Sequence, residues 1–569
     1  MKQKLILFFI LTIVLVTPKE AVAYDFSAVA PSGQTLYFKI VGGNAQVTYP
    51  LFSNHDYYYG YTKPTGNLSI PDSVLYGGNT YSVTSIGDRA FYGCSGLASI
   101  TIPNSVTSID TFAFYGCSGL LSVTIPKFVT YLGFFAFGNC SNLTIVNFNA
   151  DSCVQAGYAD DYGNNSTVFS GCTNLSTINF GNNVTSIPSF LCYDLRGIAT
   201  VNIPDSVTKI GDYAFSNCRG LTSVSIGNSV TNIGNYAFSN CRWLTSVTIP
   251  NFVTSIGKGA FKGCSGLTTV YFNAECCVKA GYASSGNGFP VFGNCTNFST
   301  IKFGNNVTSI PSHLCYGCVG LTDIEIPDSI ITVGTAAFKE CDHLTNIILG
   351  TGLSTIEDFA FYGCIQMVRI KSKLSSPPTV YANTFLGLND DVILNVPCDA
   401  ANEYENAAYW FRFNIQEDIM YDFYATSSNP ARGTVTIITE PTCDYREAQV
   451  QANAYHGYHF DHWSDGNTDN PRYIVVLQDT LLVAYFASDN GEDEGIEETE
   501  EEKVKLYQRN GQIVVEGAEG YTVCLYDVVG RLLATRRETA QEVLLDVPES
   551  GAYLVKIGDA PARRIVVRR

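Results

Sequence analysis

The residues best suited to do chemistry in this sequence are its 19 cysteines. Thiols bind metals, pair as disulfides and attack electrophiles once they ionise. Cys315 and Cys318 have the C-x-x-C spacing of redox and metal sites. The matching stretch CYDL at 192–195 has no second cysteine, so we interpret the spacing as a coincidence. Cys276 and Cys277 are adjacent in the chain and could form a local oxidised pair.

A second group of candidate ligands lies further along the chain. His456, His459 and His462 are three residues apart, and on a strand that spacing sends successive side chains to opposite faces. We therefore predict no three-histidine metal site. The stretch DGNTD at 465–469 resembles the start of a calcium loop, but it lacks the glycine at the sixth position and the glutamate at the twelfth, where Val476 stands. We interpret it as a hairpin turn.

These candidates belong to a chain that is dominated by an internal repeat. The phrase AFYGCSGLASITIPNSVTSID at 90–110 returns almost unchanged at 113–133, a shift of 23 residues. Its phenylalanine marks a column that runs through thirteen copies and ends at Phe385. A longer period of 123 residues relates FGNNVTSIPSFLCYDL at 180–195 to FGNNVTSIPSHLCYGC at 303–318. Repeats of this length indicate a solenoid in which each copy is one coil.

The apolar spacing within one copy predicts a short strand in each coil. Leu97, Ile100 and Ile102 point inward, and Pro103 then ends the segment because it has no N–H to donate. A second inward pair follows at 106 and 109. One coil cannot bury these residues by itself. Stacked coils must therefore share continuous apolar columns.

The repeat also accounts for most of the cysteines. Neighbouring coils lie about 4.8 Å apart. Their Cβ atoms point in parallel directions, however, whereas a disulfide needs them to converge. Free cysteine packs as a small apolar residue, so we predict a buried ladder of reduced thiols. Its members are Cys94, Cys117, Cys140, Cys172, Cys218, Cys241, Cys264, Cys295, Cys318, Cys341 and Cys364, with Cys192 and Cys315 in the phenylalanine column.

A repeat array offers little room for an active site. Of the six histidines, only His313 and His343 lie inside the array, and they occupy different columns. The sequence contains no evident acid–base carboxylate pair, no Ser/His/Asp set and no metal triad. It therefore predicts a protein that is not an enzyme and holds no cofactor.

The first residues predict export from the cell. Lys2 and Lys4 precede an apolar run at 5–16, and AVA at 21–23 supplies the small residues of a cleavage site. We expect a signal peptide at 1–23, because an apolar run of this length is too short to span a membrane. The net charge of −18 disfavours nucleic acid and anionic lipid as partners.

The repeated phrase A-F-x-x-C-x-x-L-x-x-V-x-I-P-x-x-V-T-x-I-G resembles the BspA-like leucine-rich repeats of bacterial surface proteins, over roughly 67–418. The resemblance implies a repeat solenoid that is right-handed, with about 13 rungs of 23 residues and a strand-lined concave face. It also implies adhesion to host matrix or bacterial partners.

Both ends of such an array need a cover for the outermost coil. The stretch 396–418 resembles the terminal cap of that family, in which Trp410, Phe413 and Ile415 cover the last apolar coil. At the other end we assign residues 24–66 to an N-terminal cap.

The outward positions of the main strand form the candidate binding face. In the early coils they carry hydroxyl and amide side chains, which are typical of a solvated strand. Later they turn aromatic and charged, which suits recognition, although drift of an exposed column explains the same change. The insertions at about 150–168 and 274–291 are a further candidate surface. The candidate residues are Tyr271, Lys302, Asp323, Glu325, Arg369 and Lys371.

Two segments follow the array. Residues 419–488 read as short alternating strands, and GYHFDHWSDGNTDNPR at 457–472 resembles the divergent B-repeat of Listeria-type internalins. That resemblance implies a small β domain used as a spacer or presenter. Residues 489–502 hold nine acidic side chains and no basic one, which is typical of a self-repelling linker.

The last module, 503–569, has the phrases of a small β-sandwich. The D-x-x-G-R turn at 527–531, the G-x-Y-x-V strand at 551–555 and the basic ending resemble the C-terminal sorting domain of the type IX secretion route in Bacteroidetes. The resemblance implies recognition by outer-membrane secretion machinery. A structural β domain without a sorting role is the alternative.

The sequence as a whole predicts a secreted, adhesin-like binding protein of the outer cell surface. Its partner is expected to be a protein or glycan of the host matrix or of a bacterial surface. A passive structural or spacer protein of the cell envelope is the alternative.

Overall fold

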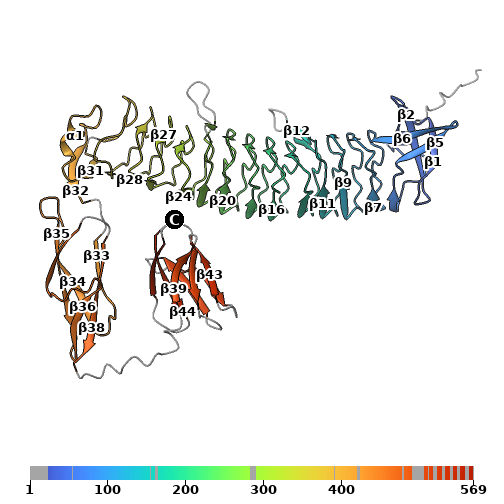
Figure 1. Ribbon diagram of the computed structural model, residues 1–569. Coiled ribbons are helices and arrows are strands. Elements are labelled where there is room, and N and C mark those ends of the chain that lie inside the picture. Colours follow the sequence, from blue (N-terminus) through green and yellow to red (C-terminus); the bar gives the residue numbers. More distant parts are fainter. Residues whose placement is uncertain are drawn as a thin grey trace, which may run out of the picture. The chain divides into compact units, whose positions relative to one another are not determined.

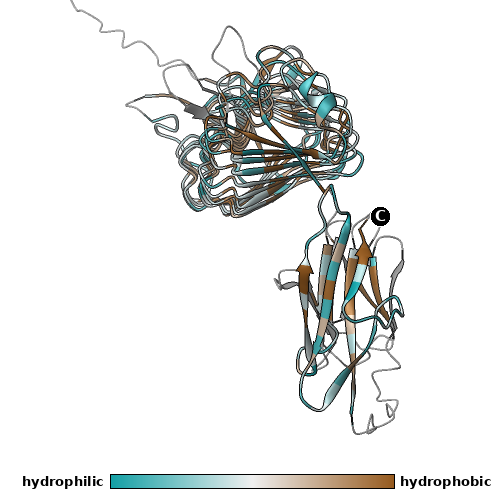
Figure 2. Cartoon of the chain, turned by 90° about the vertical axis from the view of Figure 1, so that its left-hand side faces the viewer, coloured by the Kyte–Doolittle hydropathy of each residue, from teal (hydrophilic) through white to brown (hydrophobic). Residues whose placement is uncertain are grey.

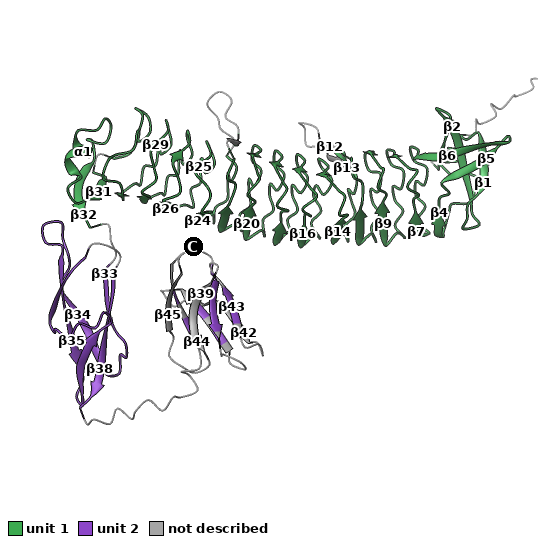
Figure 3. Cartoon of the chain, in the orientation of Figure 1, with its two compact units in different colours: residues 1–420 green, residues 421–569 purple. Residues whose placement is uncertain are grey.

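The computed structural model forms two compact units, residues 1–420 and 421–569 (Figure 3). The expected signal peptide, apart from Ala23, and the acidic linker, apart from Asp489, lie outside the described residues. The described residues are 23–53, 56–153, 156–159, 165–277, 279–281, 290–389, 391–419, 423–476, 480–489 and, beyond these, 505–509, 512–516, 522–527, 532–537, 542–547, 551–557 and 563–567.

The first unit is a solenoid whose coils each add one strand to a front row and a shorter strand to a second row (Figure 1). The ladders between neighbouring coils are parallel, and their register follows the repeat: Ser246 lies opposite Thr269, and Lys209 opposite Asn232. The predicted fold class, a repeat solenoid of short parallel strands followed by small β domains, is confirmed. The front row is β7 (Leu97–Thr101), β9 (Ser122–Ile125), β11 (Ile145–Phe148), β14 (Thr177–Phe180), β16 (Thr200–Asn202), β18 (Ser223–Ser225), β20 (Ser246–Ile249), β22 (Thr269–Phe272), β24 (Thr300–Phe303), β26 (Asp323–Ile326), β28 (Asn346–Leu349), β30 (Arg369–Ser372), β31 (Ile393–Pro397) and β32 (Asn414–Asp418).

The second row runs alongside the front row with two-residue strands. It ends near the first insertion and restarts after it, where the hairpin of β12 (Gly157–Ala159) and β13 (Asn165–Thr167) leaves the coil. Its strands are β8 (Ser108–Ile109), β10 (Tyr131–Leu132), β15 (Ser186–Ile187), β17 (Lys209–Ile210), β19 (Asn232–Ile233), β21 (Ser255–Ile256), β23 (Lys279–Ala280), β25 (Ser309–Ile310), β27 (Thr332–Val333) and β29 (Thr355–Ile356).

An antiparallel sheet precedes the first coil, within residues 24–66. Here β2 (Thr35–Val41) pairs with both β1 (Phe26–Val29) and β3 (Asn44–Thr48). Strand β3 then pairs in parallel with β6 (Asn79–Ile86), which begins the second row and also pairs with β5 (Ser73–Tyr76). Strand β4 (Gly66–Ser69) pairs with β7 and so begins the front row. The cap and the solenoid share one continuous apolar core.

Viewed along the array, successive coils lie over one another, so equivalent residues form columns (Figure 2). In the phenylalanine column, Phe215, Phe238 and Phe261 are fully buried and stack with ring centroids 5.2 Å apart. Cys192 interrupts that column, and Phe180 of the coil before it meets Phe215 edge-on at 6.3 Å. The large ring of Phe180 thus lies near the place where the phenylalanine column has the smaller Cys192.

Hydroxyl side chains form a second kind of column. Thr231 donates through Oγ1 to the backbone oxygen of Thr208 at 3.1 Å, and Thr254 donates to Thr231 in the same way at 3.1 Å. The same bond recurs in most coils between residues 84 and 354. The low charge of the chain follows in part from these uncharged polar columns, which satisfy backbone oxygens from one coil to the next.

A terminal cap closes the array after its last coil. The ring of Trp410 lies 5.1 Å from that of Phe385, and the ring of Phe413 lies 5.2 Å from it, so both cover the last phenylalanine of the column. Trp410 also donates from Nε1 to the oxygen of Pro378 at 3.0 Å. The helix α1 (Ala401–Glu405) adds the buried ring of Tyr404, and Ile415 packs on the same core.

The second unit begins with two three-stranded sheets. One contains β33 (Phe423–Ser427), β38 (Thr480–Ser488) and β36 (Tyr458–Trp463), in that order. The other contains β34 (Gly433–Thr439), β35 (Glu447–Ala454) and β37 (Arg472–Val475). Their core includes Trp463, Val450 and Leu482. Because β36 and β37 belong to different sheets, the loop between them is not a hairpin turn, and that prediction is wrong.

The last module also has two sheets, which share one core of residues such as Ile513, Leu525 and Tyr553. Gly530 and Arg531 of the D-x-x-G-R turn lie outside the described residues. The strands of the first sheet are β39 (Lys505–Arg509), β40 (Gln512–Glu516) and β43 (Glu542–Asp546). Those of the second are β42 (Leu532–Arg537), β41 (Thr522–Asp527), β44 (Gly551–Ile557) and β45 (Arg563–Val567).

The stacked phenylalanine column should be a main source of stability. We expect Phe238→Ala to lower the free energy of unfolding of the solenoid by about 3–5 kcal/mol, because it leaves a cavity between two neighbouring rings. Urea unfolding followed by circular dichroism measures the change. Phe252→Ala is the matched control, because Phe252 is 64% exposed, and its effect should stay within about 0.5 kcal/mol. Equal effects of the two changes would contradict this account.

Candidate functional site

The predicted binding face divides between two sheets of the front row. Tyr271 of β22 lies directly opposite Lys302 of β24. The other four candidates lie on a separate sheet that begins at β26. There Asp323 and Arg369 lie two coils apart in one column, and Glu325 and Lys371 in the next outward column. The structure therefore brings the candidates together as a pair and a group of four.

Polar contacts hold part of this face in place. Asn346 donates from Nδ2 to Asp323 at 2.7 Å, and the Thr322 hydroxyl donates to the other oxygen of the same carboxylate at 2.6 Å. Lys373, just beyond β30, lies 3.4 Å from the Glu325 carboxylate. Arg369 is exposed. The face therefore combines a fixed carboxylate with an accessible guanidinium, a pair suited to contact with a polar surface.

The early coils present a different front face. Asn179 donates from Nδ2 to the side-chain oxygen of Asn147 at 2.9 Å, and Asn147 donates to the Thr124 hydroxyl at 3.4 Å. These amides and hydroxyls bond to one another from coil to coil. This part of the face has the character of a solvated polar ladder, as the sequence suggested.

The cysteine ladder is buried and its thiols are free, as predicted. The structure adds a role that the spacing did not reveal. Nine of the eleven thiols approach the backbone oxygen of the phenylalanine column in the preceding coil, where that oxygen can accept the weak S–H bond. Examples are Cys117 to Phe91 at 3.1 Å, Cys140 to Phe114 at 3.2 Å, Cys218 to Cys192 at 3.0 Å and Cys264 to Phe238 at 3.1 Å.

Burial keeps these thiols protonated and unreactive. It raises the pKa of Cys94 and of Cys364 to about 12. Burial also raises the pKa of Cys315 and of Cys318, the C-x-x-C pair. Both are free thiols and both are buried. Because the thiolate is the nucleophile and the metal ligand, the C-x-x-C spacing marks core packing here.

The vicinal cysteines have unequal environments. Cys276 is exposed, and it forms no disulfide with its buried neighbour Cys277. Cys398, outside the ladder, is not a free thiol. Cys276 is therefore the thiol of the described solenoid that reagents in solution can reach.

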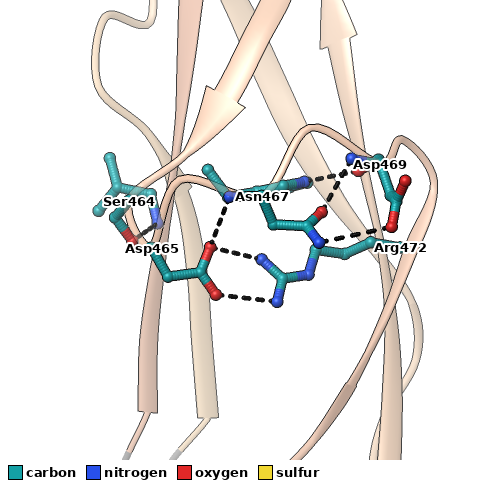
Figure 4. Close-up of polar contacts among 7 residues, drawn as sticks. Ser464, Asp465, Asn467, Asp469 and Arg472 are labelled. Atoms are coloured by element: carbon teal, nitrogen blue, oxygen red, sulfur yellow. Dashed lines mark hydrogen bonds and ion pairs between the residues drawn. The ribbon is translucent and has the colours of Figure 1, made fainter.

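The loop between β36 and β37 has its carboxylate occupied by the protein itself (Figure 4). Arg472 donates to both oxygens of Asp465 at 2.7 and 2.9 Å, and this contact lowers the pKa of the Asp465 carboxyl. Asp469 accepts from Asn467 Nδ2 and donates its N–H back to Asn467 at 2.8 Å. These contacts close the loop without a cation.

The three nearby histidines do not gather. His459 lies 2.9 Å from Asp489, while His462 lies 2.9 Å from Asp461. Within the described part of the chain, no three His, Cys, Asp or Glu side chains lie where they could hold a metal ion.

A cavity of about 310 Å³ lies on a surface that the sequence analysis did not single out. It opens between two coils of the back wall, the side of each coil that carries the phenylalanine and cysteine columns. Tyr193, Asp194 and Arg196 form one wall. The signal for it in the sequence is the arginine that recurs 23 residues apart at 196, 219 and 242.

The fold and its repeated columns define a leucine-rich-repeat solenoid followed by small β domains. The chain belongs to the family described as the BspA type leucine rich repeat region, whose model matches residues 77–157, 164–279 and 288–388, more than half of the chain. Residues 493–567 match a domain of unknown function (DUF6383). No enzyme family is found among the matches.

Solved structures with similar repeats come from several bacteria. A leucine-rich repeat protein from Bacteroides ovatus is 23% identical, with a TM-score of 0.39, over 70% of this chain and 100% of its own. A leucine rich cell surface protein from Faecalibacterium prausnitzii is 23% identical, with a TM-score of 0.27, over 61% of this chain and 94% of its own. The pneumococcal vaccine antigen PcpA is 14% identical, with a TM-score of 0.30, over 70% of this chain and 98% of its own. No curated protein matches this chain significantly.

Within the described residues, no helix has the length and apolar character needed to cross a membrane.

The buried thiols predict a loss of stability at alkaline pH. Unfolded thiols ionise from about pH 9, whereas Cys94 and Cys364 keep their protons to about 12. The stabilisation is therefore complete below pH 9 and is lost as the pH rises toward 12, by up to about 1.4 kcal/mol per pH unit for each thiol.

Urea unfolding in a reducing buffer at about pH 8 and about pH 10.5 measures this slope. Replacing Cys94 and Cys364 by alanine should make the free energy of unfolding fall less steeply with pH. This comparison separates the effect of the thiols from that of the tyrosines, which also ionise near pH 10. An unchanged slope in that variant would contradict the assignment.

The closed loop predicts no stabilisation by calcium. Millimolar Ca²⁺ should leave the melting temperature of the full chain unchanged, because Arg472 already occupies the Asp465 carboxylate. Arg472→Gln should lower the stability of the module by about 1 kcal/mol at neutral pH, a small value because Asp465 is half exposed. The effect should fade as the pH drops below the ordinary pKa of aspartate, about 3.9. A clear upward shift of the melting temperature with Ca²⁺ would contradict this reading.

Proposed function

We propose that this protein binds a protein or glycan at the outer cell surface through the front face of its solenoid. The observation that carries the proposal is the change along that face. Early coils present amides and hydroxyls that bond to one another, whereas coils from β22 onward present Tyr271, Lys302 and Arg369. Tyr271 is 38% exposed and Arg369 is exposed, so burial does not account for an aromatic ring and a cation in these outward positions.

The geometry of the later coils supports contact with a polar partner. Successive residues of one outward column are about 4.8 Å apart along the array. Asp323 is fixed by two hydrogen bonds, and Glu325 has Lys373 at 3.4 Å. Carboxylates that are already held in this way lose little side-chain entropy when a partner binds.

Export and surface placement are part of the same proposal. The signal peptide expected at 1–23 would start secretion. The C-terminal module would be read by the outer-membrane machinery of the type IX route, which its D-x-x-G-R and G-x-Y-x-V phrases resemble. The small two-sheet module at 419–488 would serve as a B-repeat-like spacer.

A passive spacer of the cell envelope is the second candidate. The self-bonded polar ladder at Thr124, Asn147 and Asn179 favours it, because that part of the face makes its hydrogen bonds internally. The two candidates differ in whether the later coils bind anything.

Binding of the full chain to matrix proteins, glycan arrays and bacterial cells tests the proposal. We expect saturable binding that weakens roughly tenfold when Lys302, Glu325 and Arg369 are changed together to alanine, because charge-assisted hydrogen bonds are lost. Lys209→Ala is the control, since Lys209 is exposed on β17, in the second row.

The absence of saturable binding to any of these probes would contradict the binding proposal and favour the passive spacer. Saturable binding that the triple variant does not change would remove the front face as the site.

A further inference from the structure

The back wall of the solenoid has a regular ladder of backbone hydrogen bonds. In most coils the N–H of the phenylalanine column and the N–H two residues later donate to the next coil. Phe215 donates to Ala237 and Asn217 donates to Ser239, each at 2.7 Å. In the described chain, Phe169 and Gly171 make no such bond to the coil of Cys192. The ladder is therefore open beside the hairpin β12–β13.

The cavity of about 310 Å³ occupies this opening. Phe169 and Gly171 lie on one side of it, and Tyr193, Asp194 and Arg196 on the other. The hydroxyl residues Thr167, Ser170 and Thr173 complete the polar lining. A cavity of this size lies at the lower end of the range for small-molecule sites. It offers N–H and hydroxyl donors, a carboxylate and the aromatic side chains of Phe169 and Tyr193.

Positive charge continues from the cavity along three coils. Arg196 pairs with Asp194 at 3.0 Å, yet its side chain is 61% exposed. Arg219 and Arg242 occupy the same column in the next two coils, and Arg219 has a buried Nε without a hydrogen-bond partner. A line of three arginines stands out in a chain with a net charge of −18.

An exposed tryptophan lies at the end of this line. Trp243 follows Arg242 and is 67% exposed. Its column holds glycine in neighbouring coils, at 197, 220 and 266. A tryptophan there buries little surface and so does little for the fold. A bare aromatic ring beside a cation is suited to pack on the flat face of a ligand ring.

The coils are locked together beneath these side chains. Asn217 donates from Nδ2 to the Tyr193 hydroxyl at 2.8 Å, and Asn240 donates to the side-chain oxygen of Asn217 at 3.1 Å. Asp194 also donates its N–H to Ser216 at 2.8 Å. The cavity wall and the arginine line therefore belong to one rigid stretch of three coils, about 10 Å long.

The 123-residue duplication supplies an internal comparison. The ladder is also open at the equivalent place, where Phe292 and Asn294 make no bond to the next coil in the described chain. The opening is therefore a consequence of the shared insertion. The charged and aromatic residues are not shared: Val319, Asp342, Ile365 and Gln366 stand where the first block has Arg196, Arg219, Arg242 and Trp243.

We propose that the cavity and the arginine line, at 167–173, 193–196, 219 and 242–243, bind an acidic polysaccharide, one whose sugar units carry carboxylate or sulfate groups. One sugar unit enters the cavity, where its hydroxyls meet Asp194, Ser170 and Thr173. The next units lie along Arg219 and Arg242, whose guanidinium groups pair with the anions. A pyranose ring packs on Trp243.

The combination of guanidinium groups, hydroxyl groups, a carboxylate and an exposed indole ring favours an acidic polysaccharide as the ligand. Guanidinium is always charged and matches carboxylate and sulfate oxygens with two parallel N–H bonds. A purely anionic ligand would be repelled by Asp194 inside the cavity, whereas a sugar presents hydroxyls there. An acidic peptide offers the anions but not the hydroxyl-rich ring for the cavity. This site is separate from the front face, so neither proposal depends on the other.

Calorimetric titration of the full chain with a chondroitin sulfate hexasaccharide, which carries both kinds of anion, tests the proposal. Cellohexaose is the neutral probe and hexaglutamate the acidic peptide probe. We expect binding of the acidic hexasaccharide that weakens as salt screens the charges, and no comparable binding of the other two.

The duplication provides the variants, because the second block already accommodates the replacements. The triple change Arg196→Val, Arg219→Asp and Arg242→Ile should weaken binding at least roughly tenfold and flatten the salt dependence. Trp243→Gln should weaken it roughly tenfold and keep the salt dependence. Lys209→Gln removes one exposed charge elsewhere and should change nothing, as should the front-face triple variant.

Three outcomes would overturn the proposal. They are no binding of the acidic hexasaccharide, binding that the triple change leaves intact, or hexaglutamate binding of equal strength that Trp243→Gln does not alter. Failure of the front-face screen would leave this test unaffected, because its variants lie on the back wall.

Discussion

Every coil of this solenoid depends on its two neighbours for its hydrogen bonds and for its core. A coil has no partner of its own for the N–H of Phe215, which donates to Ala237 at 2.7 Å in the next coil. In the next coil, the buried ring of Phe238 stacks between the rings of Phe215 and Phe261, with each centroid 5.2 Å away. Because each contact is with an identical neighbour, the same residue types must recur at the same spacing. The ends need different chemistry, and Trp410 and Phe413 provide it at one of them.

This dependence explains why so reactive a residue is used so often. A side chain in the cysteine column must be small, apolar and able to donate to a backbone oxygen of the preceding coil. Alanine has no donor, and serine carries a larger cost of burial for its hydroxyl. Cysteine meets all three demands, as Cys241 does toward Phe215 at 3.3 Å. The same burial that makes it a good packing residue removes its nucleophilic character, because the thiolate is not tolerated there.

The spacing of residues predicted the features that the repeat itself determines. The phenylalanine column, the buried thiols and the parallel register follow from a 23-residue period, which fixes what lies above Phe91 or Cys94. The loop at 465–469 was misread because the partners of β36 and β37 are the distant strands β38 and β35. No local signal in DGNTD reveals that the chain crosses between sheets there. The candidate residues of the front face lie on two separate sheets, and this division depends on where strand pairing stops.

The cavity beside the first insertion could not be predicted from the sequence, for a similar reason. Its walls come from Phe169 and from Tyr193, and only the missing bonds between their coils create the space. The spacing of Arg196, Arg219 and Arg242 can be read from the sequence. It indicates a binding site only together with the cavity beside Arg196. The structure of a repeat is easiest to predict where the repeat is regular. This cavity lies where the backbone hydrogen bonds between two regular stretches are missing.

The two openings in the back-wall ladder also bear on how the array responds to force. In a stack held by nearest-neighbour contacts, cooperativity passes from coil to coil through the interface between them. Beside both insertions the back-wall bonds are absent in the described chain. The front strands on either side, β14 and β16 or β24 and β26, also belong to different sheets, as do β7 and β9 and β18 and β20 elsewhere in the row. Tension along the array would therefore be carried there by side-chain packing more than by backbone bonds. The solenoid then behaves as three elastic segments in series, and a load would open it first at the two junctions while each segment stays intact.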